Sequence, residues 1–198
     1  MCNETQVSVP IPFYSQRVAS EGYHRDGFES PEDALIWQER GCGIACLRMV
    51  VDGFRTARHE FLGPNYADLV RRGLETHAYC ERGWVHAGLV RLAHELGIEG
   101  KSFQRSTSAK LARELSADRP CIASVTVCFD RGPAMSRPRG GHLVVVLGFT
   151  GEEKSPNGFI VNHPSSVVEY NWPQRTIPIS VFDACFSGAF MSFWDRGK

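Results

Sequence analysis

The sequence lacks an excess of charge of either sign, because its 22 Lys and Arg residues balance 22 Asp and Glu residues and leave a formal net charge of +0. Without a basic excess there is no electrostatic basis for binding nucleic acid or an anionic membrane. No hydrophobic run approaches the roughly 20 residues of a membrane helix, and residues 1–10 lack the apolar segment of a secretory signal. We therefore expect a cytoplasmic protein with neither nucleic acid nor membrane as a partner.

The seven cysteines are odd in number and irregularly spaced. In a chain without an export signal they are expected to be free thiols and not a disulfide framework. A zinc site built from Cys42 and Cys46 with His86 or His94 is the one metal arrangement that the pattern suggests. No second pair of ligands follows at zinc-finger spacing, so we expect neither a metal nor any other cofactor.

The predicted elements change in kind along the chain, from helices to strands. Apolar residues at helical spacing predict helices over residues 42–54, 66–74, 84–96 and 108–115. Runs of β-branched and aromatic residues predict strands over residues 7–15, 121–129, 142–149, 158–161, 167–170 and 189–194, and residues 17–33 are expected to form a long loop. This order predicts an α+β protein. We expect a single domain, residues 1–198, with a helical part at about 38–118 and a sheet part at about 119–198.

Cys42 lies between Gly41 and Gly43 at the start of the first predicted helix. A helix N-terminus directs free N–H groups and the positive end of the helix dipole at such a sulfur, which lowers the thiol pKa and favours the thiolate. Further along the chain, His142 opens a β-branched strand after Gly141. A thiol nucleophile needs a base of this kind beside it, so Cys42 and His142 are the candidate catalytic pair.

A catalytic histidine also needs a group that fixes its orientation. The strand after His142 ends at Asn162 and His163, just before Pro164. Adjacent strands of a hairpin bring residues to matching depth, so either residue is a candidate neighbour of His142. The Asn162 side-chain oxygen is able to accept from the imidazole N–H and fix its tautomer. The two side chains are expected to point to opposite faces of the strand.

Several segments together resemble the bacteriocin-processing peptidase family, in its stand-alone branch. They are residues 11–16 (IPFYSQ), 41–49 (GCGIACLRM), 141–149 (GHLVVVLGF), 159–164 (FIVNHP) and 180–183 (SVFD). That bacterial family is papain-like and cleaves leader peptides after a double glycine. The resemblance spans nearly the whole chain, and its most specific part is the cysteine motif.

The resemblance implies a papain-like fold, a nucleophile at Cys42 and a base at His142. Cys46 matches a position where the family accepts alanine, so it is interpreted as helix packing. The family's oxyanion-hole glutamine precedes the cysteine. Gln16, in the sequence Tyr-Ser-Gln, matches it, and Gln38 is a second candidate.

The third triad position departs from the family, because an Asp usually stands before the proline and this chain has His163. Either Asn162 has taken the orienting role, as Asn does in papain-like enzymes, or the triad is weakened or abandoned. Asn162 is the preferred candidate and His163 the alternative.

These residues favour a cysteine peptidase or amide hydrolase that works through an acyl-enzyme on a peptide or amide substrate. Two alternatives remain open: an acyltransferase or cyclase in a biosynthetic pathway, and a catalytically inactive papain-like binding module. The Gly- and Pro-containing residues 130–141 lead into His142 and are expected to gate the site.

Overall fold

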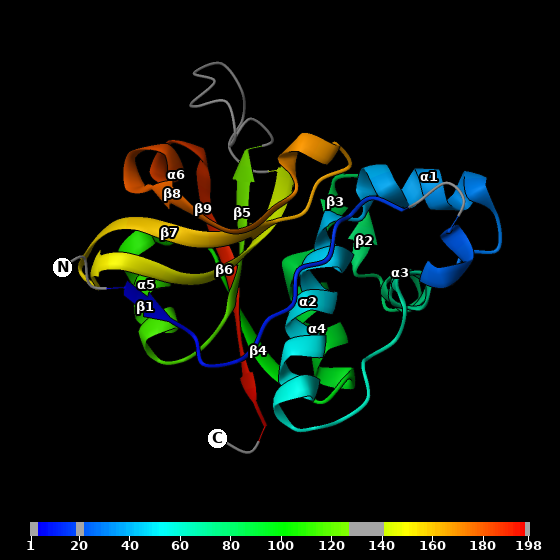
Figure 1. The fold of residues 1–198 in the computed structure, drawn as a ribbon, viewed down its shortest axis with the longest axis horizontal. Coiled ribbons are helices and arrows are strands. Elements are labelled where there is room, and N and C mark those ends of the chain that lie inside the picture. Colours follow the sequence, from blue (N-terminus) through cyan, green and yellow to red (C-terminus); the bar gives the residue numbers. More distant parts are fainter. Residues whose placement is uncertain (1–3, 19–21, 127–140, 197–198) are drawn as a thin grey trace.

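The computed structural model describes residues 4–18, 22–126 and 141–196. These residues form a helical half and a sheet half, which lie side by side in Figure 1. The predicted α+β architecture is confirmed. Residues 127–140 lie outside the described ranges, so the predicted gating segment, like the end of the predicted strand 121–129, lies largely outside them too.

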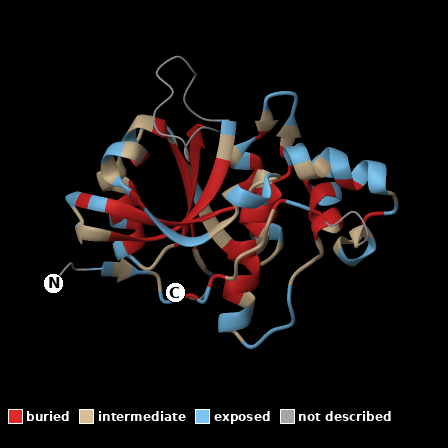
Figure 2. Cartoon of the chain, turned by 45° about the horizontal axis from the view of Figure 1, so that its top comes forward, coloured by how far each residue is buried: buried red, intermediate tan, exposed pale blue. Residues whose placement is uncertain are grey.

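The helical half contains four helices: α1 (Pro31–Arg40), α2 (Cys42–Ala57), α3 (Tyr66–Glu75) and α4 (His86–Glu95). A two-stranded ribbon of β2 (Tyr79–Cys80) and β3 (Gly83–Trp84) joins α3 to α4, and a 3-10 turn, η1 (Tyr23–Asp26), precedes α1. α2 is the central element, and most of its residues are buried. Figure 2 shows this burial running along α2 and the sheet, with exposed residues on the outer helices.

The sheet half is an antiparallel sheet in the order β4-β9-β5-β6-β7-β8, with β1 paired to β6. Its strands are β1 (Glu4–Gln6), β4 (Ile98–Phe103), β5 (Cys121–Thr126), β6 (Gly141–Glu152), β7 (Ser155–His163), β8 (Trp172–Pro178) and β9 (Phe186–Asp195). Two short helices, α5 (Ser108–Ser116) and α6 (Ile179–Cys185), and the 3-10 turn η2 (Val168–Tyr170) complete the described elements.

The sheet has a separate hydrophobic core on each face. Along β6, Leu143, Val145 and Leu147 pack into the core that contains α2. Val144 and Val146 pack into the core that contains α5 and α6. This alternation follows from the two-residue period of a β-strand, and it decides on which face each polar residue near the site lies.

Some predicted elements differ from the observed ones. Residues 7–15 are not a strand, because Pro10 and Pro12 have no N–H to donate to a ladder. Residues 167–170, predicted as a strand, form mainly the 3-10 turn η2. Helix α1 was not predicted, although Ser30 caps it by accepting from the Asp33 N–H, with Pro31 at the first helical position.

Strands β4 and β8 were also not predicted. β4 contains a Gly-Lys-Ser sequence, and most residues of β8 are exposed, so neither has the apolar alternation that identifies a strand. Among the described residues, no helix combines the length and the apolar character needed to cross a bilayer.

Candidate active site

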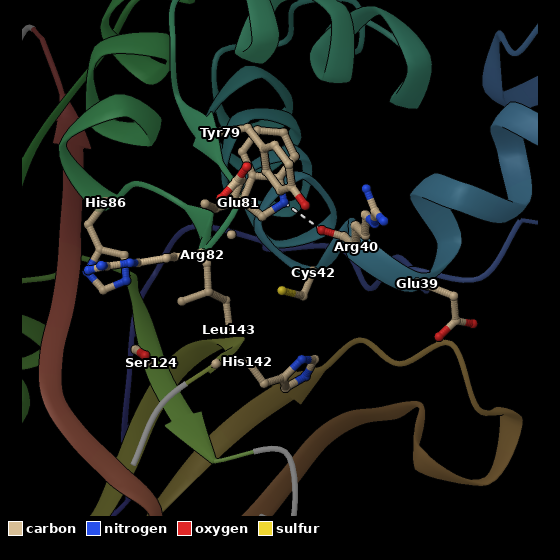
Figure 3. A pocket seen from close by; sticks show the side chains of 13 residues that line it. Glu39, Arg40, Cys42, Tyr79, Glu81, Arg82, His86, Ser124, His142 and Leu143 are labelled. Atoms are coloured by element: carbon tan, nitrogen blue, oxygen red, sulfur yellow. Dashed lines mark hydrogen bonds between the residues drawn. The ribbon is translucent and has the colours of Figure 1, made fainter. Parts of the chain in front are cut away.

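Cys42 and His142 line one pocket of about 360 Å³. It lies where the first turn of α2, the β2–β3 ribbon and the start of β6 meet, as the close view in Figure 3 shows. The sequence therefore identified two residues that the fold brings to the same cavity from segments far apart in the chain. In the described residues, however, no hydrogen bond joins the Cys42 sulfur to His142.

The Cys42 sulfur is surrounded by backbone donors at the start of α2. The N–H groups of Leu143, Gly43 and Cys42 itself all favour the thiolate. Burial opposes them and is the larger effect, so the pKa of the thiol is raised to about 11. The predicted lowering of this pKa is therefore wrong: the donors are present, but desolvation of the sulfur outweighs them.

Cys46 lies one turn further along α2 and is fully buried. Its thiol donates to the carbonyl of Leu143 at 3.3 Å, and burial raises its pKa well above the usual value. Both sulfurs thus contact the backbone of Leu143, one through its N–H and the other through its carbonyl. These contacts favour a packing role for Cys46.

The imidazole of His142 donates a hydrogen bond to the backbone carbonyl of Pro164. Its Nε2 atom is buried and has no hydrogen-bond partner among the described residues, so we assign the donor to Nδ1. This tautomer leaves the Nε2 lone pair available, as a general base requires. Burial, reinforced by the neighbouring His163, lowers the pKa of His142 to about 3, although the bond to Pro164 opposes the shift.

The pKa of His142 predicts an acid-sensitive stability. Below about pH 6.5 the unfolded chain binds a proton at this histidine, whereas the folded protein binds it only near pH 3. Stability is therefore lost as pH falls from 6.5 towards 3, by up to about 1.4 kcal/mol per pH unit. Urea unfolding at pH 7.5 and 5.0 should show a larger drop for the wild type than for His142→Gln. Equal drops would contradict a lowered pKa of His142 in the folded protein.

The two candidates for the third triad position lie on opposite faces of β7. Asn162 pairs with Val145 of β6 and faces α2. There its amide donates to the Pro12 carbonyl at 3.3 Å and lies 3.6 Å from the Met49 sulfur, while its oxygen accepts from the Gln174 N–H at 2.9 Å. In the part of the chain that the structure describes, no hydrogen bond joins Asn162 to His142.

His163 lies on the face that carries His142, and the two ring centroids are 4.8 Å apart. Its Nδ1 bonds to the carbonyl of Tyr170 in η2, and its ring packs against Trp172. The residue that follows, Pro164, supplies the carbonyl that orients His142. The structure thus brings the alternative candidate, His163, into contact with the base.

The two candidate oxyanion-hole glutamines, Gln16 and Gln38, link the chain around Gln16 to the end of α1. The Gln16 amide nitrogen donates to the backbone carbonyl of Gln38 at 2.7 Å, in the last turn of α1. The Gln38 side chain instead accepts from the Val18 N–H at 3.2 Å. Neither glutamine lines the pocket of Cys42. Gln16 is 4% exposed and its amide nitrogen bonds to α1 three residues before Gly41. The Gln38 side-chain oxygen is held against the chain after Gln16.

Sequence reasoning missed the part that Trp84 plays in this pocket. Its indole N–H donates to the carbonyl of Arg40 at 2.7 Å, and its ring lines the cavity. A Cβ atom at Gly43 would collide with that ring, so only glycine fits beside Cys42. The glycine after the cysteine was the signal in the sequence for this close packing.

A cysteine at the N-terminus of a central helix that shares a pocket with a histidine at the start of a strand is typical of papain-like cysteine peptidase folds. The chain belongs to the Peptidase_C39-like family, whose model matches residues 9–186. No curated protein matches the sequence.

Solved structures of this class share the fold. A double glycine motif protease from an AMS/PCAT transporter, solved in complex with its leader peptide, aligns with a TM-score of 0.59 at 21% identity, covering 97% of this chain and 99% of that one. A putative C39-like peptidase from Bacillus anthracis gives a TM-score of 0.63 at 13% identity, covering 99% and 100%. The peptidase domain of Streptococcus ComA gives 0.53 at 21% identity, covering 79% and 93%.

Proposed function

We propose that this protein is a cysteine peptidase that cleaves a peptide substrate through an acyl-enzyme. The observation that supports this most directly is the pocket shared by Cys42 and His142, at a helix start rich in N–H donors. Membership of the family supports the reaction class. The leader peptide bound to the similar transporter protease supports a peptide as substrate.

In the proposed mechanism, the thiol of Cys42 passes its proton to Nε2 of His142, and the sulfur attacks the substrate carbonyl. The Gln16 amide and the Cys42 N–H stabilise the oxyanion. His142 then protonates the leaving amine and activates the water that releases the acyl group. Because the thiol pKa is raised and the imidazole pKa lowered, both groups are neutral before substrate binds, and proton transfer accompanies the attack.

The third group of the triad is proposed to be composite. The carbonyl of Pro164 fixes the tautomer of His142, and the ring of His163 packs against it. Neither group carries the negative charge of a carboxylate, so the imidazolium that forms during catalysis is stabilised less than in a Cys-His-Asp triad.

Restoring a carboxylate gives a direct test of this third position. His163→Asp is expected to raise the pKa of His142 by about 1–3 units, because a nearby opposite charge favours the imidazolium. The acidic limb of the pH profile of kcat/KM should move upward by a similar amount, because His142 must be unprotonated to act as the general base. Asn162→Asp is the matched control on the opposite face of β7 and should leave that limb in place. If Asn162→Asp shifts this limb and His163→Asp does not, then Asn162 is the residue that orients His142.

The function itself is tested by incubating the protein with peptides that contain double-glycine and unrelated sequences, followed by mass spectrometry. We expect cleavage that ceases after Cys42 is alkylated with iodoacetamide. An added amine that captures the acyl group in preference to water would indicate the acyltransferase alternative. Peptide binding without cleavage would indicate the binding module.

A further inference from the structure

Gln16 is carried by an irregular segment, residues 7–18, which we call the arm. In Figure 1 it runs from β1 across α2 towards α1. The Val7 N–H still bonds to the carbonyl of Leu147 in β6, but the arm then leaves the sheet. Pro10 and Pro12 rule out a continuous strand there. Because no sheet ladder in the described part of the chain holds the arm beyond Val7, the position of Gln16 depends on side-chain contacts between the arm and the rest of the fold.

Asn162 makes one such contact. Its amide donates to the carbonyl of Pro12, and its oxygen accepts from the N–H of Gln174 in β8. The register of β7 with β8 shifts between Val161 and His163, which leaves the Gln174 N–H opposite Asn162 to be satisfied by a side chain. Asn162 is 1% exposed, so its side chain makes both bonds from a buried position. The side chain thus ties the arm to the sheet.

Asp52 makes a second contact from the helix that carries Cys42. The Tyr14 hydroxyl donates to its carboxylate, and burial together with this bond raises the pKa of Tyr14 to about 12. The guanidinium of Arg48 lies 4.5 Å from the centre of the Tyr14 ring and 3.9 Å from the Asp52 carboxylate. Asp52 is 1% exposed and also accepts from the Gly63 N–H at 2.6 Å. The arm is therefore tied to α2 two residues before Gln16.

We propose that Asn162 and Asp52 are positioning residues that hold the arm between β7 and α2 and thereby set the amide of Gln16 against Cys42. The inference rests on the proposed function, because it takes Gln16 as the oxyanion donor. It gives Asn162 a role that acts through Gln16 and not through His142. The chemistry of the contact requires an amide, since an aspartate at this position would set a carboxylate oxygen against the Pro12 carbonyl.

A double-mutant cycle with Gln16 tests the proposal. Asn162→Ala and Tyr14→Phe are each expected to lower kcat on a cleaved peptide by roughly tenfold or more, with KM little changed, because a displaced donor is lost from the transition state. Either change combined with Gln16→Ala should cost no more than Gln16→Ala alone. Asn162→Asp should be as damaging as Asn162→Ala. Tyr14→Phe removes a single hydroxyl, so it keeps the test valid if Asn162→Ala does not fold.

The rate at which iodoacetamide alkylates Cys42, measured against pH, separates this role from one at His142. The profile is expected to stay unchanged in Asn162→Ala and Tyr14→Phe, because alkylation needs the thiolate but no oxyanion hole. His163→Ala is the control: its profile should shift, and its loss of kcat should add to that of Gln16→Ala.

Three outcomes would overturn the inference while leaving the peptidase intact. The first is that the losses of Asn162→Ala and of Tyr14→Phe both add to that of Gln16→Ala. The others are a shifted alkylation profile in Asn162→Ala and full activity in Asn162→Asp. A wild-type protein that cleaves no peptide would instead overturn the proposed function and the inference with it.

Discussion

Cys42→Ala is expected to abolish peptide cleavage, with a loss in kcat of at least about 10⁴-fold, because no other group supplies the nucleophile of the acyl-enzyme. Cleavage is measured by mass spectrometry of the products, and the fold is checked by circular dichroism. Removal of the sulfur also removes a partly buried thiol that titrates above the usual range. The variant should therefore be stable to higher pH than the wild type.

Cys46→Ala is the matched control, since Cys46 is on the same helix one turn away. It loses a thiol bond to the carbonyl of Leu143 and leaves a small gap in the core. We expect it to keep most of the activity and to lose some stability. Equal loss of activity in the two variants, with both folded, would show that Cys46 takes part in the chemistry.

Gln16→Ala is expected to lower kcat by roughly 10²-fold or more, the usual effect of removing one oxyanion donor. The Gln16 amide nitrogen donates one of its two hydrogens to the carbonyl of Gln38, and the second is able to bond to a substrate oxygen. Gln38→Ala is the control and should cost less, because the Gln38 side chain accepts from the Val18 N–H. The reverse order of effects would assign the oxyanion hole to Gln38.

The sequence was sufficient to predict the parts of the site that depend on local structure. Cys42 opens α2 and His142 lies at the start of β6 because glycines and an apolar run mark each beginning. The two residues were predicted to meet, and they line one pocket. Local pattern is enough here, because the position of a residue at the end of an element is set by the element itself.

Which residue lies beside His142 depends instead on the register between strands β6 and β7, and the sequence does not determine that register. Asn162 lies opposite Val145, and the β6–β7 ladder shifts between Val146 and Gly148. The sequence predicts that Asn162 and His163 face opposite ways, but it does not say which of them faces His142. The thiol pKa of Cys42 was likewise beyond prediction, since it depends on how much of the folded chain covers the sulfur.

The place of Trp84 has a practical consequence for detecting ligands. Its indole forms a wall of the pocket and is bonded to the carbonyl of Arg40 at the end of α1. Under the proposed function, a peptide in this pocket lies against a natural fluorophore that is only 9% exposed. The protein carries its own optical reporter of occupancy, and Trp84→Phe separates that signal from the other three tryptophans of the chain.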